Sequence, residues 1–288
     1  MKFVTFTKNS KELPGVISAD GAHVHPLEGW CCLVDFIADY DAKGRGTAEK
    51  LAVKGGGIPL ADVKLEAPIP HPRNGILCVG LNYVEHAIES AKAVGREYEA
   101  PERPAYFIKR VDRAVAPGGE IPSHTGLTEM LDYEVELAVI IGKRCRNVKR
   151  EDAFAHVFGY TVSNDVSARD LQRGYTQWAF GKSLDGSAPM GPWIVTIDEF
   201  QSPPSLRVTA KVNGEIRQDS NTNDFIFDIP HLISELSQGI TLEPGDIIMT
   251  GTPSGVGMGF TPPKFLRPGD VVELEIEGIG VLKNKIKD

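Results

Sequence analysis

The clearest pattern of polar and apolar positions lies near the middle of the chain. Three acidic residues, Asp132, Glu134 and Glu136, alternate with apolar ones and lead into an uninterrupted apolar run over 137–141. Alternation is typical of a β-strand, in which every second side chain lies on the same face, and a short apolar run indicates a strand buried on both faces. The sequence therefore predicts a buried strand that presents three carboxylates on one side at its start.

Comparable patterns predict the remaining elements. Strands are expected over 75–80 and 157–163 and, in the last hundred residues, over 206–212, 246–249, 271–277 and 281–286. Helices are expected over 33–40, 47–53, 83–94 and 230–237, and a further helix is expected to start within 164–172. Asn82 is placed to cap the helix over 83–94. Because strands dominate the larger part of the chain, we predict an α+β, mainly β fold with a few helices over a rolled sheet.

A proline-rich segment, 66–72, is a natural boundary because proline interrupts regular secondary structure. We therefore expect a small N-terminal α/β domain, residues 1–65, and a larger domain, residues 70–288. Within the larger domain the polar segment 95–104 has the composition of a mobile loop and is a candidate lid over a site.

Charge and composition narrow the class of protein. The chain has 288 residues and a formal net charge of −8, and its Lys and Arg residues form no run, which argues against nucleic acid as a partner. No apolar stretch reaches membrane-spanning length, and the first residues do not resemble a signal peptide. The four cysteines show neither a Cys-x-x-Cys pair nor a zinc-ligand spacing. We expect a cytoplasmic protein with reduced cysteines and no membrane association.

Glu134, Glu136 and Asp165 are candidate metal ligands, and Asp165 follows the strand expected over 157–163. Carboxylates on an apolar strand repel one another and lose hydration unless a cation lies among them. Hard oxygen ligands of this kind suit Mg²⁺ or Mn²⁺. Two simpler interpretations remain open, a solvent-facing strand edge for the two glutamates and a helix N-cap for Asp165.

His86 and Glu89 lie three residues apart on the helix expected over 83–94, so they share a face. A glutamate beside an imidazole can orient the ring and raise its basicity, as a general base requires. The alternative is an ordinary solvated helix face.

Two further segments resemble phosphate loops only in part. The Gly-Lys pair that ends at Lys182 lacks the glycine that a P-loop needs five residues earlier, where Thr176 stands. In its apolar context Lys182 is a candidate cation for an anion, or a lysine that extends to the surface. The glycine-rich segment 250–257 is not followed by a helix, which argues against a dinucleotide site, but its backbone N–H groups could bind a carboxylate.

Taken together and in this order, these segments resemble the fumarylacetoacetate hydrolase family. The matching pieces are VGLNY at 79–83 with His86 and Glu89, LDYEVELAVIIG at 131–142, GYT at 159–161, NDVSARDLQ at 164–172, GKS at 181–183, PMGP at 189–192 and GTPSGVG at 251–257. The resemblance extends from about residue 70 to the end of the chain, and the first 65 residues carry no such signature.

The resemblance implies a mixed β-roll catalytic domain of the family's C-terminal type, usually dimeric. It implies that Glu134, Glu136 and Asp165 bind Mg²⁺ or Mn²⁺. It further implies that His86 and Glu89 form a water-activating dyad, that Lys182 stabilises negative charge and that Arg169, Gln172 and Thr252 contact the substrate. Many small members have an arginine where this chain has Leu81, so the resemblance does not indicate how the distal end of the substrate is bound.

The chemistry expected of such a site centres on an enolate. With a 2,4-dioxo acid the dyad would deliver water to the C4 carbonyl, and the charge on the 2-oxygen would be stabilised by the metal and by Lys182. We therefore expect a homodimeric, metal-dependent hydrolase of an acylpyruvate-like or fumarylpyruvate-like 2-oxo acid. Oxaloacetate decarboxylation and keto–enol tautomerisation or isomerisation share this intermediate and are the alternatives. A non-catalytic 2-oxo acid binding protein is a third.

Overall fold

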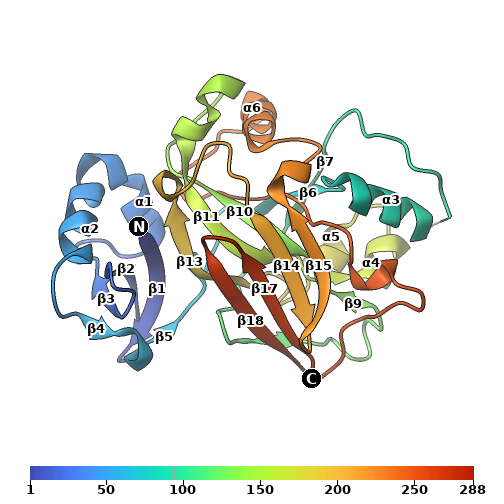
Figure 1. Cartoon of the computed structure of the whole chain (residues 1–288), viewed down its shortest axis with the longest axis horizontal. Helices are drawn as coiled ribbons and strands as arrows, with labels where there is room; N and C mark the ends of the chain where they lie inside the picture. Colours follow the sequence, from blue (N-terminus) through green and yellow to red (C-terminus); the bar gives the residue numbers. More distant parts are fainter. Residues whose placement is uncertain (94) are drawn as a thin grey trace.

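The computed structural model describes residues 1–93 and 95–288. The strands of its large sheet are Lys2–Lys8 (β1), Lys11–Ile17 (β2), His23–Pro26 (β3), Ile58–Pro59 (β4), Lys64–Leu65 (β5), Ile76–Gly80 (β6), Ala105–Lys109 (β7), Val135–Ile141 (β10), Val157–Asn164 (β11), Met190–Thr196 (β13) and Ile247–Met249 (β16). Their order is β4-β3-β2-β1-β13-β11-β10-β16-β6-β7, with β5 paired to β1. The β16–β6 pair is parallel and its neighbours are antiparallel, so the sheet is mixed (Figure 1).

A second sheet covers one face of the first. Its strands are Glu120–Pro122 (β8), Arg207–Val212 (β14), Glu215–Asn221 (β15), Val271–Ile276 (β17) and Gly280–Lys287 (β18), in the order β15-β14-β17-β18-β8. A short separate pair joins Leu131–Asp132 (β9) to Ser167–Ala168 (β12). In Figure 1 the second sheet lies in front of β10 and β11. The mainly β, α+β architecture predicted from the sequence is confirmed.

Strand β10 is the centre of the core, because all of its residues are buried. On one face Leu137 packs in a cluster with Leu274 of the second sheet. On the other face Ala138 belongs to a different cluster, which includes Phe36 from the N-terminal part of the chain. Because side chains alternate along a strand, Glu136 lies on the same face as Ala138.

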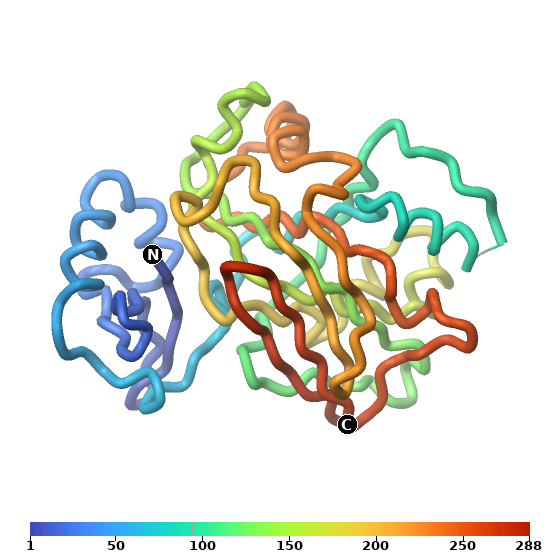
Figure 2. The backbone as a smooth tube through the Cα atoms, viewed as in Figure 1, coloured from blue at the N-terminus to red at the C-terminus, as the bar shows by residue number. Residues whose placement is uncertain are grey.

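The N-terminal part of the chain continues the large sheet, since β1 pairs with β13 and Phe3 lies opposite Ile194. Helices α1 (Leu33–Ala38) and α2 (Arg45–Ala52) pack beside this end of the sheet, on the left of Figures 1 and 2. The division into residues 1–65 and 70–288 stays a prediction.

Four further helices lie around the larger part of the molecule. They are Val84–Ala93 (α3), Arg169–Gly174 (α4), Ala179–Lys182 (α5) and Ile229–Gly239 (α6). Short 3₁₀ turns cover Leu60–Asp62, Arg150–His156, Ile197–Glu199, Thr222–Asp224 and Gly257–Gly259. Figure 2 shows residues 95–104 arching outward before the chain returns as β7.

Several local predictions need correction. Helix α3 begins at Val84, and its expected last residue, Val94, lies outside the described residues. The Asn82 side chain does not cap this helix: its Oδ1 accepts from the Phe227 amide at 2.8 Å, and its Nδ2 donates to the Thr250 carbonyl at 2.7 Å. The sequence patterns did not reveal β7, β13 or β15.

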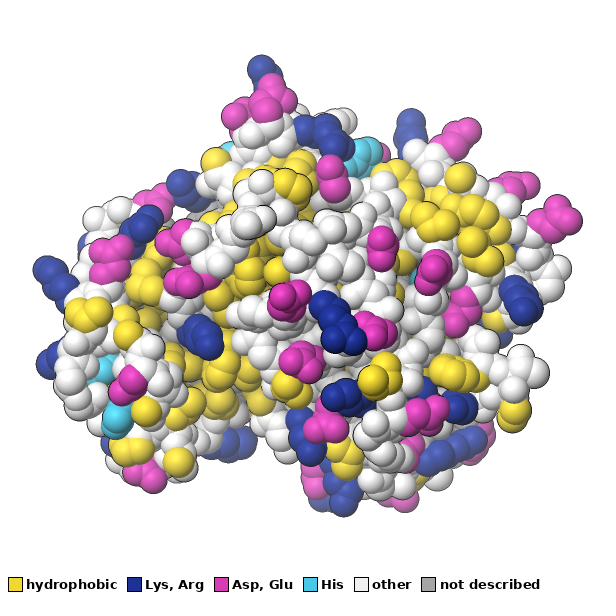
Figure 3. Space-filling view, viewed as in Figure 1, with side chains coloured by type: hydrophobic (Ala, Val, Ile, Leu, Met, Phe, Trp, Pro, Cys, Tyr) yellow, Lys and Arg dark blue, Asp and Glu magenta, His cyan; other side chains and the backbone are white. Residues whose placement is uncertain are grey.

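Lys and Arg side chains are interspersed with Asp and Glu on the face shown in Figure 3, so that face offers no extended basic surface. Within residues 1–93 and 95–288, none of the helices combines the length and the apolar composition needed to cross a bilayer.

Candidate active site

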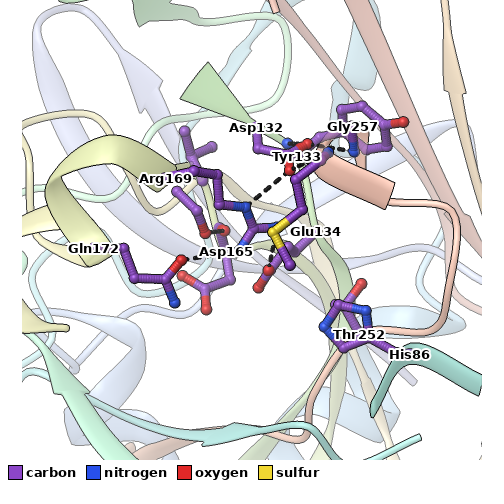
Figure 4. Close-up of polar contacts among 12 residues, drawn as sticks. His86, Asp132, Tyr133, Glu134, Asp165, Arg169, Gln172, Thr252 and Gly257 are labelled. Carbon is purple, nitrogen blue, oxygen red and sulfur yellow. Dashed lines mark hydrogen bonds and ion pairs between the residues drawn. The ribbon is translucent and has the colours of Figure 1, made fainter. Parts of the chain in front are cut away.

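One cavity of about 850 Å³ gathers eight of the nine predicted site residues. Those that line it are His86, Glu134, Glu136, Asp165, Arg169, Gln172, Lys182 and Thr252. Glu89 stands behind His86, with its Oε2 3.2 Å from the imidazole Nδ1. In the view of Figure 4, Asp165 and Gln172 lie on one side of Glu134, and His86 and Thr252 lie on the other.

Strand pairing brings the three predicted metal ligands together. Val135 lies opposite Asn164 in the antiparallel pair of β10 and β11, so Glu134 and Asp165 flank one end of that pair. One carboxylate oxygen from each of Glu134, Glu136 and Asp165 lies within 4.8 Å of the other two, and all three residues are buried. The simpler interpretations are wrong: the strand is not solvent-facing, and helix α4 begins at Arg169 with Ala168 as its N-cap.

Two buried lysines contact these carboxylates. Lys182 Nζ lies 2.7 Å from Glu134 Oε2 and 2.6 Å from Asp165 Oδ2. Lys109 Nζ lies 2.6 Å from Asp165 Oδ1, and this second lysine was missed in the sequence. The strand that carries Lys109 exposes two of its apolar residues, Tyr106 and Ile108, so the usual assignment of apolar positions to the buried face conceals the inward lysine.

The surroundings of Glu134 and Glu136 shift the pKa values of their carboxyl groups in opposite directions. Although burial alone would raise it, the charges of Arg169 and Lys182 lower the pKa of Glu134 below its ordinary value. Burial and the neighbouring Asp165 and Glu134 charges raise the pKa of Glu136 well above its ordinary value. Glu136 instead accepts a 2.8 Å hydrogen bond from the Gly251 amide, and no ion pair to Glu136 is found in the described residues.

A divalent cation fits this donor set. Four buried carboxylates, Asp132, Glu134, Glu136 and Asp165, face three cationic groups, Lys109, Arg169 and Lys182, which leaves one excess negative charge in the cluster. An uncompensated buried carboxylate is costly, and hard oxygen ligands are those that Mg²⁺ and Mn²⁺ prefer. Glu136 is the one carboxylate of these four for which the described residues supply no ion pair.

The Arg169 side chain links the buried carboxylates to Gln172, another residue of the cavity wall. Its Nε donates to Asp132 Oδ2 at 2.8 Å, and its Nη1 donates to Gln172 Oε1 at 3.1 Å. Its Nη2 lies 2.6 Å from Glu134 Oε1, an ion pair in which the N–H groups are not aligned for a hydrogen bond. Arg169 thus contacts Asp132, Glu134 and Gln172 at once, and in Figure 4 it lies between Asp132 and Glu134.

The His86–Glu89 pair is held against the glycine-rich segment 250–257. Glu89 Oε1 accepts from the Gly255 amide at 3.0 Å while Oε2 faces His86. A Cβ atom added at Gly259 would lie 2.0 Å from Glu89 Oε1, so a larger residue there would force this carboxylate to move. With Nδ1 turned to Glu89, the neutral imidazole keeps Nε2 as its basic atom. The solvated-face interpretation is wrong, since His86 is 4% exposed.

The predicted anion-binding capacity of segment 250–257 is confirmed, and its anions are the protein's own carboxylates. Gly251 donates to Glu136, Gly255 to Glu89, and Gly257 to Asp132 at 2.6 Å. Gly251 has a φ of +99°, and a Cβ there would approach the Cβ of Asn82 to 2.7 Å. The segment thus positions the acidic groups of the site through its backbone.

Comparison with known proteins agrees with these features. Residues 75–287 match the family model described as fumarylacetoacetate (FAA) hydrolase C-terminal. The chain is 52% identical over 227 residues to oxaloacetate tautomerase YisK of Bacillus subtilis, which covers 79% of this chain and 74% of that protein. It is 43% identical over 256 residues to the mitochondrial oxaloacetate tautomerase FAHD2A of Bos taurus, covering 88% of this chain and 79% of that protein.

A solved structure shares the whole fold. The fumarylacetoacetate hydrolase of Exiguobacterium antarcticum superposes with a TM-score of 0.81 at 38% sequence identity, covering 100% of this chain and 99% of that chain. The similarity thus includes the N-terminal part of the molecule, for which the sequence carried no motif.

Proposed function

Because the chain belongs to the fumarylacetoacetate hydrolase family, we propose that it is a divalent-metal-dependent enzyme that interconverts the keto and enol forms of oxaloacetate. The observation that carries this choice is the 52% identity to an oxaloacetate tautomerase, together with a cavity whose acidic, cationic and imidazole groups suit a proton shift beside a carbonyl. Hydrolysis of an acylpyruvate, expected first from the sequence, becomes the second candidate.

We propose that Glu134, Glu136 and Asp165 hold the cation, which is Mg²⁺ or Mn²⁺. When bound, such an ion polarises a 2-oxo group and lowers the cost of negative charge on its oxygen. Protein cations orient two of the three carboxylates: Lys182 and Arg169 contact Glu134, and Lys109 contacts Asp165.

The proton shift itself is assigned to side chains of this chain. Tautomerisation removes a proton from one of the atoms C3 and O2 of the substrate and returns a proton to the other. His86 is the group suited to carry it, because Glu89 holds Nδ1 and leaves Nε2 available in the cavity wall. Lys182 supplies a buried positive charge: burial alone would lower its pKa, but Asp165 and Glu134 hold the pKa above its ordinary value. A charged ammonium at this position stabilises an anionic substrate oxygen.

Arg169, Gln172 and Thr252 are proposed as substrate contacts. Gln172 and Thr252 line the cavity, and each already shares its side-chain oxygen with one protein donor, Arg169 Nη1 and Gln218 Nε2 respectively. Each therefore holds a defined orientation before the substrate arrives, which reduces the entropy lost on binding. The chain is further proposed to act as a homodimer, which size-exclusion chromatography with light scattering tests directly.

One specific contact keeps hydrolysis as a second candidate. The His86–Glu89 pair is the arrangement that a water-activating base requires, and a proton shift alone does not need a bound water. With a 2,4-dioxo acid the same imidazole would deprotonate water for attack at C4.

A panel of three reactions separates these activities. Ultraviolet absorbance follows enol loss from oxaloacetate, lactate dehydrogenase coupling follows pyruvate from its decarboxylation, and acetylpyruvate cleavage follows hydrolysis, each with Mg²⁺ or Mn²⁺ and after chelation. The proposal expects metal-dependent acceleration of the enol–keto exchange as the dominant activity. Exchange at the uncatalysed rate in the presence of both metals would refute it, and faster cleavage of acetylpyruvate would favour the second candidate.

A further inference from the structure

Arg173 is a charged side chain of the cavity wall whose protein contacts leave its charge unmatched. It lies on α4 and lines the same cavity as the carboxylate cluster. Its one hydrogen bond runs from Nη2 to the Met258 sulfur at 3.0 Å, and a thioether is a weak acceptor. Among the residues that the structure describes, no carboxylate lies within ion-pair distance of this guanidinium.

The position of Arg173 follows from that of Arg169. Residues four apart on a helix lie on the same face, about one turn or 5.4 Å along the axis. Arg169 is 1% exposed and is occupied by Asp132, Glu134 and Gln172, whereas Arg173 is exposed to the cavity mouth. Burial and the nearby Arg169 charge lower the pKa of Arg173 below its ordinary value, and the Asp132 charge only partly opposes this effect. Among the described residues, Arg173 is therefore a cation of the cavity wall with no ion-pair partner beside α4.

The other groups near the mouth do not supply that charge to Arg173. Glu97 and Glu99 also line the cavity, yet neither forms an ion pair with Arg173 in residues 1–93 and 95–288. Leu81, which also lines the cavity, is apolar, and Arg96 adds a second positive side chain. A ligand with a carboxylate at its outer end would supply the ion pair that Arg173 lacks among the described residues.

We propose that Arg173 binds the second carboxylate of a four-carbon 2-oxo dicarboxylate and thereby selects oxaloacetate over 2-oxo acids with an uncharged tail. This inference rests on the proposed function, because it places the 2-oxo end of the substrate at the carboxylate cluster. A four-carbon skeleton spans less than one helical turn, about 5.4 Å, so both ends can lie along the Arg169–Arg173 face. Arginine suits the task because its planar guanidinium binds a carboxylate through two parallel hydrogen bonds.

The test compares two ligands that differ only in that charge. Oxaloacetate and 2-oxosuccinamate, in which a carboxamide replaces the 4-carboxylate, are titrated calorimetrically into the intact protein with Mg²⁺, and saturating oxalate verifies that both occupy the same site. Wild-type protein is expected to bind oxaloacetate about tenfold to a hundredfold more tightly than the amide. In Arg173→Met, which keeps the length and apolar stem, this preference is expected to vanish while the affinity for the amide changes less than about twofold. Arg173→Lys is expected to retain part of the preference.

Arg207→Met is the matched control, since Arg207 is an exposed arginine that pairs with Asp219 away from the cavity. It is expected to leave both affinities unchanged. An equal loss of affinity for both ligands in Arg173→Met, or no loss for either, would overturn the assignment while leaving the proposed reaction intact. If neither ligand binds to the wild-type protein with Mg²⁺, the proposed function fails and this inference fails with it.

Discussion

Asp132 and Arg169 form a fully buried ion pair, with Oδ2 of the aspartate 2.8 Å from Nε of the arginine. The same carboxylate accepts from the Gly257 and Met258 amides at 2.6 and 3.1 Å. Asp132 therefore orients Arg169, which in turn contacts Glu134. Asp132 also holds the end of the glycine-rich segment 250–257 against β9 through these amide hydrogen bonds. Neither the metal nor the substrate has to touch Asp132 for its loss to disturb the site.

Asp132→Asn is expected to destabilise the fold by about 3 kcal/mol, because it removes one of the two carboxylates that pair with the buried Arg169 charge. Urea denaturation of the metal-free protein measures this. The matched control is Asp219→Asn, which removes the partner of the exposed Arg207 and is expected to cost less than about 1 kcal/mol. Similar costs for the two variants would contradict the role given to Asp132.

Glu136→Gln is expected to weaken metal binding and to reduce its dependence on pH. In the metal-free protein the pKa of Glu136 is raised, so over a range above pH 4.5 the folded chain holds a proton that the unfolded chain has released. Its contribution to stability is thus complete below the unfolded pKa and is lost as pH rises through the folded value. A cation displaces this proton, so metal affinity should rise with pH across the same range.

Calorimetric titration of Mg²⁺ in buffers of different ionisation enthalpy counts the protons released. Wild-type protein should release a proton on binding metal and Glu136→Gln should not, with Glu273→Gln on β17 as a control. Metal affinity that is flat with pH in the wild-type protein would contradict this linkage.

The sequence predicted the central features of the fold and site because they depend on local alternation and on long motifs. The carboxylates at 134 and 136 and the buried run after them follow from a period of two, and strand pairing then brings Asp165 beside them. Lys109 was not predicted as a site residue, because the exposed face of its strand carries the apolar residues Tyr106 and Ile108. At these two positions the usual relation between hydrophobicity and burial is reversed. Asn82 looked like a helix cap, whereas its partners, Phe227 and Thr250, are distant in sequence.

The contacts among glycines and carboxylates could not be predicted from the sequence either, since nothing local to Gly259 indicates that Glu89 lies against it.

Gly259→Ala is expected to push Glu89 away from His86 and to lower kcat for the proton shift about tenfold to a hundredfold, with a small change in KM. Steady-state kinetics and the pH–rate profile measure the effect. Gly239→Ala, where an added Cβ meets nothing within 4 Å, is the control and should match the wild type. Normal kinetics in Gly259→Ala would show that the contact does not hold the dyad.

His86→Ala distinguishes the reactions that share this cavity. Tautomerisation and hydrolysis both need a group that carries a proton, and a general base contributes about 10²-fold to 10⁴-fold to the rate, so both should fall by about 10²-fold or more. Decarboxylation of oxaloacetate needs no attacking water and no base, because the departing group is CO₂, and it should persist at a rate near that of the wild-type protein.

The matched control is His231→Ala. His231 also faces a glutamate on its own helix, with Nε2 3.3 Å from Glu235, but it lies outside the cavity. Equal loss of all three activities in His86→Ala, with metal still bound, would mean that His86 supports the site as a whole rather than carrying the proton. Retention of tautomerisation alongside loss of hydrolysis would move the proton transfer to another group and restrict the dyad to activating water.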